Sequence, residues 1–143
     1  MAHALFTWDT RSPLTPNDYR EPLLQVADPS GHETNGLLTD LNAYFPSAEV
    51  WVGLQAYETR QWLDLDEVVI PDMWADAVAA GGDAIADGTV AYTITGTRQR
   101  AGVWHDQPET SAHPVAFTLF LTCPPDGEPC YLLRLSRLGE PLP

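Results

Sequence analysis

The chain has no lysine. Its seven basic residues are all arginines and stand against 20 aspartates and glutamates, which gives a formal net charge of −13. The segment from Glu21 to Asp87 holds thirteen of these acids and a single base, Arg60. A field of this sign repels nucleic acid and anionic membranes and attracts basic partners. We therefore expect no direct contact with nucleic acid or membrane, although a codon bias against lysine would produce the same composition.

Long apolar runs are also missing. No stretch approaches the roughly 18 residues of a membrane span, and the N-terminus lacks the basic and apolar regions of a signal peptide. With 143 residues, of which 44% are hydrophobic, the chain is long enough to bury a core. No repeat or linker divides it, so residues 1–143 are expected to form a single acidic globular domain.

Cysteine is scarce, and the two present, Cys123 and Cys130, flank the turn of a hairpin predicted over residues 115–138. A two-residue loop would place them opposite each other but would put Pro125, which has no N–H, in a hydrogen-bonded pair. A three-residue loop, Pro125–Gly127, avoids this and gathers the large apolar residues on one face. Its register pairs Leu121 with Tyr131, Leu119 with Leu133 and Phe117 with Leu135. It predicts two free thiols, and free thiols favour the cytoplasm.

Hydrophobic periodicity elsewhere predicts an α+β domain. We expect a curved, mainly antiparallel sheet of about six or seven strands with two short helices. The helices are expected from Asn35 to Pro46 and from Pro71 to Ala80, where Gly81 and Gly82 end the second one. Strands are expected at 4–8, 23–27, 48–57, 61–70 and 89–95. The strand at 61–70 is expected to bend at Asp64, Asp66 and Glu67, and a bulge or bend is expected at Gly96 before an extended continuation to Trp104. The remaining strands form the hairpin, which follows a polar loop from His105 to His113.

Sequence motifs for cofactors are absent. The chain has no Gly-rich phosphate loop, no C-x-x-C, no G-x-S-x-G and no calcium loop, so no cofactor and no metal are expected. The one cluster with catalytic residue types is His105, Asp106 and Glu109. Such residues in a pocket of the curved sheet would suit a small-molecule-binding or acid–base enzyme domain, which is the alternative hypothesis.

The leading hypothesis is a non-enzymatic domain that docks on a basic protein. Immunity proteins, antitoxins and inhibitors of nucleic-acid-binding enzymes share this acidic profile, in which charge speeds association and a few aromatic residues supply affinity. The expected docking residues are Asp64, Asp66, Glu67, Asp72, Trp74 and Asp76, with Trp51 as an exposed anchor. A structural subunit that forms a homodimer through an edge strand is a further alternative.

Overall fold

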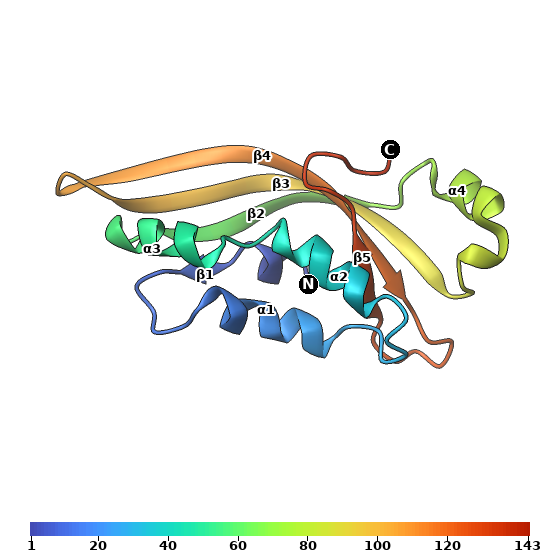
Figure 1. Cartoon of the computed structure of the whole chain (residues 1–143). Helices are drawn as coiled ribbons and strands as arrows, with labels where there is room; N and C mark the ends of the chain where they lie inside the picture. Colours follow the sequence, from blue (N-terminus) through green and yellow to red (C-terminus); the bar gives the residue numbers. More distant parts are fainter.

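The computed structural model describes residues 1–143 and has one curled antiparallel sheet in the order β1-β2-β3-β4-β5 (Figure 1). The strands are β1 (Trp8–Asp9), β2 (Arg60–Val69), β3 (Thr89–Trp104), β4 (Gln107–Thr122) and β5 (Tyr131–Leu135). The α-helices are α1 (Pro16–Gln25), α2 (Thr34–Asn42), α3 (Ala48–Ala56) and α4 (Trp74–Gly81). The predicted α+β class with a curved antiparallel sheet is confirmed. The sheet has five strands rather than six or seven, and four α-helices replace the expected two.

The hairpin of β3 and β4 is the longest feature of the sheet. Its strands pair without a break from Thr89–Thr122 to Trp104–Gln107. The connecting residues His105 and Asp106 have φ of 48° and 61°, as in a two-residue type I′ turn. The polar loop expected from His105 to His113 is therefore wrong, because all but these two turn residues belong to β4. The bulge or bend expected at Gly96 is absent from the continuous pairing of β3 with β4. The pairing of β2 with β3 is irregular between Leu65 and Glu67, where a bend was expected.

Three helices cover one side of the sheet (Figure 1). α1 begins with a capping box in which Thr15 Oγ1 accepts from the Asp18 N–H, while the Asp18 carboxylate accepts from the Thr15 N–H. α3 begins at Ser47, whose hydroxyl accepts from the Val50 N–H. These caps start helices, so the strands expected at 23–27 and 48–57 are wrong. The predicted helices near 35–46 and 71–80 are confirmed as α2 and α4, with bounds that differ by one to four residues.

The core lies between these helices and the inner face of the sheet. It is a cluster of 18 buried hydrophobic residues. Phe117 of β4 is central: its ring lies 5.4 Å from that of Phe6 and 5.6 Å from that of Tyr44, which follows α2. Aromatic contacts at these distances stabilise a core beyond the area that they bury.

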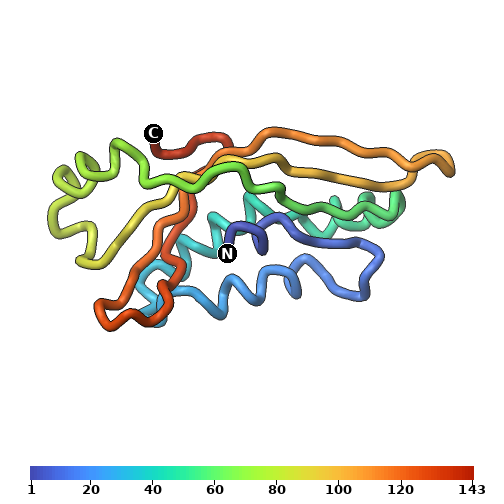
Figure 2. Tube along the Cα trace, turned by 180° about the vertical axis from the view of Figure 1, so that it is seen from behind, coloured from blue at the N-terminus to red at the C-terminus, as the bar shows by residue number.

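The C-terminal segment after β5 extends the cover of β4. The Ser136 N–H donates to Thr118 O and the Gly139 N–H to Ala116 O, at 3.0 and 2.8 Å. The segment then passes to the outer side of the sheet, where Pro143 O accepts from the Met73 N–H at 2.8 Å just before α4. Figure 2 shows the C-terminus and α4 on this side, with the β3–β4 turn at the far end.

The predicted hairpin at the C-terminus exists, but its register and its free thiols are wrong. Cys123 and Cys130 form a disulfide. Thr122 pairs with Tyr131 and Leu121 with Leu132, and an irregularity then shifts the register so that Leu119 pairs with Leu135. The ladder stops at Thr122, so Pro125 lies in an irregular loop and its missing N–H does not disfavour this register. The argument for a cytoplasmic location rested on free thiols and loses that support.

Candidate functional site

The predicted acidic docking residues gather where β2 leaves the sheet and the chain enters α4. Asp64, Asp66 and Glu67 lie on the second half of β2, Asp72 follows it, and Asp76 is in the first turn of α4. All five side chains belong to exposed residues. We call residues 64–78 the β2–α4 surface. It lies at the end of the sheet opposite the β3–β4 turn (Figure 1).

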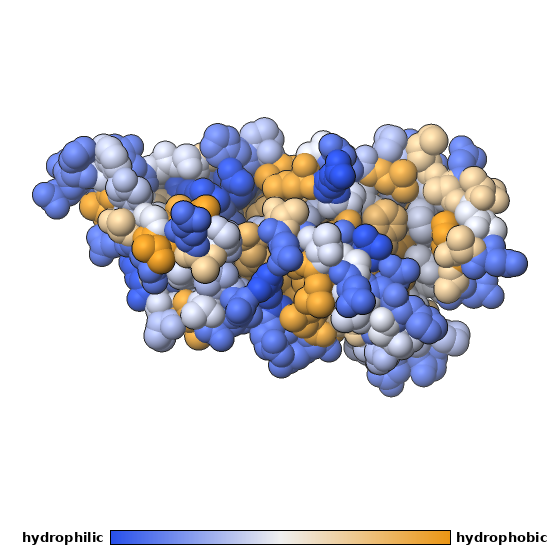
Figure 3. Space-filling model, viewed as in Figure 1, coloured by the Kyte–Doolittle hydropathy of each residue, from blue (hydrophilic) through white to orange (hydrophobic).

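Exposed apolar side chains share this surface, and the sequence patterns did not single them out. Ile70 is 62% exposed, Val68 48% and Met73 47%. Six of the chain's 13 exposed large apolar residues fall here, the others being Leu65, Val69 and Val78. In Figure 3 apolar side chains lie among hydrophilic ones over the end of the molecule that carries α4. Apolar surface rimmed by polar residues is typical of interaction sites.

The outer edge of β2 is uncovered along this surface. β1 pairs with β2 only at Gln61 and Arg60. From Trp62 to Val69, β2 therefore has β3 as its single neighbour strand. An edge of this kind presents unpaired backbone N–H and C=O groups to which another strand can bind.

The carboxylates of the surface have no cationic partner. The three salt-bridge contacts of the structure join Arg11 to Asp9, and Arg134 to Glu33 and Asp40. Asp64 accepts a hydrogen bond from the neutral Gln99 amide at 3.0 Å. The negative charge of the β2–α4 surface is thus left uncompensated.

The two tryptophans expected at the docking site have different surroundings. Trp74 is half-buried, and its ring centre lies 5.9 Å from that of Phe120, so it attaches α4 to the outer side of the sheet. Trp51 is 5% exposed, with its ring 5.3 Å from Trp8 and 5.9 Å from Tyr19. The expectation that Trp51 is an exposed anchor is wrong, because residue 51 lies on the buried face of a helix rather than on the polar face of a strand.

The alternative catalytic residues do not line a common pocket. His105 and Asp106 form the exposed turn of the hairpin, and the His105 ring lies 4.6 Å from that of Trp104. Glu109 lines a pocket of about 370 Å³ that also contains Tyr57 and Trp104 but neither His105 nor Asp106. No group of histidine, cysteine, aspartate or glutamate side chains is arranged to hold a metal ion.

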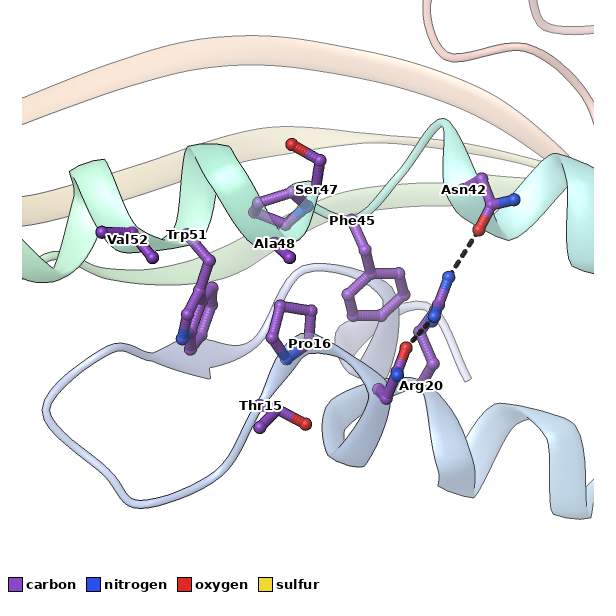
Figure 4. Close-up of a pocket in the computed structure, with 11 residues that line it drawn as sticks. Thr15, Pro16, Arg20, Asn42, Phe45, Ser47, Ala48, Trp51 and Val52 are labelled. Carbon is purple, nitrogen blue, oxygen red and sulfur yellow. Dashed lines mark hydrogen bonds between the residues drawn. The ribbon is translucent and has the colours of Figure 1, made fainter.

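A pocket of about 510 Å³ lies between the N-terminal ends of α1 and α3 (Figure 4). Pro16, Phe45 and Trp51 supply its apolar wall. Its one charged lining residue is Arg20, which donates hydrogen bonds to the side-chain oxygens of Asn17 and Asn42. Neutral amides therefore hold the guanidinium, and no carboxylate, histidine or cysteine lines the pocket to supply acid–base or nucleophilic chemistry.

A smaller cavity of about 170 Å³ lies on the inner face of β3, beneath the residues that connect α2 to α3. It is lined by two arginines, Arg98 and Arg100. The sequence interpretation missed this pair, although a signal was present. Val90, Tyr92 and Ile94 share a face with residues 98 and 100 if the strand runs through Gly96 without interruption. The bulge or bend expected at Gly96 concealed that alternation.

Comparisons of the chain with models of known protein families, with curated proteins and with solved structures found no match. Function is therefore inferred from the surfaces and cavities of this molecule. None of its helices has both the length and the apolar character needed to cross a membrane.

Proposed function

We propose that the protein is a non-enzymatic binding domain whose β2–α4 surface docks on a basic protein partner, in the manner of immunity proteins, antitoxins and inhibitors. One coincidence carries the proposal. Within fifteen residues, 64–78, the chain combines an uncovered strand edge, exposed apolar side chains and carboxylates that lack cationic partners.

The apolar residues supply the affinity in this proposal. Exposed Val68, Ile70 and Met73 would lose water when a partner covers them, and burial of apolar area contributes roughly 25 cal/mol per Å² before the costs of association. The half-buried ring of Trp74 stands at the base of α4. A residue of this type anchors interfaces when its pocket is completed by the partner.

The acids determine which partner is accepted. Asp64, Asp66 and Glu67 lie on the strand whose edge is open, so a strand that adds there meets their negative field. A basic segment is attracted and an acidic one is repelled. A second copy of this chain, at net charge −13, is among the repelled partners.

The experiment is affinity capture from native lysate followed by association kinetics with the isolated partner. A variant with Asp64→Asn, Asp66→Asn and Asp72→Asn tests the surface. We expect one stoichiometric basic protein whose association with the variant is slower by about an order of magnitude at low salt. The salt dependence of the association rate should also become flatter, because fewer charges steer the encounter.

A matched control changes the same net charge elsewhere. Glu49, Glu58 and Glu109 are exposed acids outside the β2–α4 surface, and their replacement by glutamine should alter the association rate much less. Unchanged kinetics in the Asp64, Asp66 and Asp72 variant would overturn the proposal. Equal slowing by both variants would show that net charge, rather than this surface, guides the partner.

A further inference from the structure

The partly buried arginine pair on the inner face of β3 plays no part in the proposed docking. Arg98 and Arg100 lie two residues apart on the inner face of β3, the face that carries the core. Phe6, Tyr44 and Phe45 line the same cavity. The protein thus places two of its seven positive charges next to each other beside aromatic rings.

No carboxylate compensates these charges. None of the ten residues that line the cavity is an aspartate or glutamate, although the chain has 20 of them. The salt-bridge contacts of the structure involve only Arg11 and Arg134. In so acidic a protein, two neighbouring arginines that both lack an acid partner are unexpected, because a partly buried charge is stable when it is paired.

The hydrogen bonds of the pair are also incomplete. Arg98 Nε is buried and has no hydrogen-bond partner. Arg100 Nε donates to the neutral Oε1 of Gln61 at 2.8 Å, and its guanidinium carbon lies 5.3 Å from the centre of the Trp8 ring. Burial lowers the pKa of Arg100, and the charge of Arg98 lowers it further. An anion in the cavity would relieve the repulsion between the two guanidinium groups.

We propose that this cavity binds a small organic carboxylate, with its charged group on Arg98 and Arg100 and its apolar body against Tyr44 and Phe45. Guanidinium groups bind carboxylates through paired N–H donors, so a planar carboxylate fits the arginines better than a spherical ion does. The volume of about 170 Å³ is close to that of cavities of roughly 150 Å³ that admit benzene. The site is distinct from the β2–α4 surface, and neither proposal depends on the other.

Benzoate is the probe of choice because it combines a carboxylate with a body of this size. In an NMR titration of the whole protein, we expect saturable binding with a dissociation constant of about 1 mM or tighter, within reach of so small a ligand. The largest shifts should fall on the backbone amides of Arg98, Arg100 and Tyr44. Benzamide, which has the same shape without the charge, should bind at least ten times more weakly. Inorganic phosphate should also bind more weakly, because it cannot use the apolar wall.

Arg98→Met tests the assignment, with Arg137→Met as the matched control at an exposed arginine outside the cavity. Arg98→Met should weaken benzoate binding at least tenfold, and Arg137→Met should leave it unchanged. Removing one of two unpaired like charges should not lower the thermal unfolding midpoint of the free protein. If Arg98→Met does not fold, Arg98→Lys keeps the charge but not the paired donors and should still weaken binding severalfold.

Three results would overturn the proposal. Benzoate could fail to saturate at concentrations well above 1 mM, or benzamide could bind as tightly as benzoate. Phosphate binding that equals benzoate binding would show a site for any anion rather than for an organic carboxylate. The docking experiment measures association at the β2–α4 surface, so its result does not change the interpretation of the benzoate titration.

Discussion

The two outer edges of the sheet are both uncovered over part of their length, but their chemistry differs. β4 lacks a neighbour before Ala116, where the C-terminal segment begins to cover it. Thr118 and Ala116 direct their backbone groups toward that segment, and this direction alternates along a strand. The outward positions farther along β4 are therefore Pro108, Thr110, Ala112 and Pro114. Proline has no N–H, so two of these four donors are absent.

The open edge of β2 contains no proline between Trp62 and Val69. It carries exposed Leu65, Val68 and Val69 together with Asp64, Asp66 and Glu67. Prolines reject any added strand, whereas charges reject only strands of the same sign. Two missing donors therefore disfavour strand addition at β4, and under the docking proposal the acids of β2 would select strands by their charge. The proposal therefore expects a basic partner at β2 rather than a second copy of this chain.

Removing the disulfide is expected to have the largest effect on stability. It would also free the adjacent end of β5 from β4 and so lengthen the open edge of β4. Cys123 and Cys130 lie just beyond the last pair of the β4–β5 ladder. For a loop this short, the double variant Cys123→Ala/Cys130→Ala should lose about 2–3 kcal/mol of unfolding free energy. Denaturant unfolding measures the loss, and hydrogen exchange of the Phe120 and Thr122 amides, which face β5, should report fraying of β5. A reductant should destabilise the wild type similarly and leave the variant unaffected; a reductant without effect on the wild type would contradict the pairing.

Neutralising the acids of β2 should allow two copies of the protein to pair through this strand edge. In the variant Asp64→Asn/Asp66→Asn/Glu67→Gln, about three like-charge contacts across an antiparallel dimer disappear, each worth roughly 0.2–1 kcal/mol. Dimerisation should strengthen by about tenfold to a hundredfold, as measured by analytical ultracentrifugation at low salt.

The Glu49→Gln/Glu58→Gln/Glu109→Gln variant is the control, because it has the same net charge and an unchanged β2. It should remain as monomeric as the wild type. A wild type that already dimerises tightly through β2 would remove the distinction between the two edges.

The sequence predicted the sheet best where one face is buried and the other is solvated. Val90, Tyr92 and Ile94 alternate because they face the core, and they correctly indicated β3. Alternation misled at Ala48–Tyr57: Val50 and Val52 are 54% and 65% exposed in a helix that buries Trp51. Valines that face solvent do not distinguish the repeat of a strand from that of a helix. Ser47 at the N-cap and Glu49 in the first turn, by contrast, did indicate the start of a helix.

The candidate site was predictable in its charges and not in its apolar part. The acids from Asp64 to Asp76 can be identified in the sequence. Whether Val68, Ile70 and Met73 are exposed depends on how the helices and strands pack, which the sequence pattern does not give. A run such as Val68-Val69-Ile70 indicates burial when it is considered alone. The disulfide was missed for a related reason, since the length of the β4–β5 ladder decides whether Pro125 takes part in it.

Alkaline pH should loosen the segment that covers β4. Tyr44 donates its hydroxyl to Ser136 O at 2.7 Å, and burial raises the pKa of Tyr44 well above its usual value. Because the folded pKa exceeds the unfolded one, this stabilisation is complete below about pH 10 and is lost as pH rises further. Tyr44→Phe should lose about 1 kcal/mol at pH 8 for the missing hydrogen bond and fall less steeply above pH 10. Tyr57→Phe, at an exposed tyrosine, should keep the wild-type slope in unfolding measurements; an unchanged slope in Tyr44→Phe would contradict the assignment.

Replacing the two outward prolines of β4, which restores their backbone N–H donors, should have the smallest effect. In Pro108→Thr/Pro114→Thr both new N–H groups point outward, so the fold should keep its stability within about 0.5 kcal/mol. Self-association should rise only a few-fold by ultracentrifugation, because this part of the edge offers hydrogen bonds without an apolar surface. Thr110→Pro, a third outward proline, should leave both stability and monomeric state unchanged. If the double threonine variant dimerised as strongly as the acid-neutralised one, backbone donors alone would determine strand addition. The apolar residues of β2 would then not distinguish it as the docking edge.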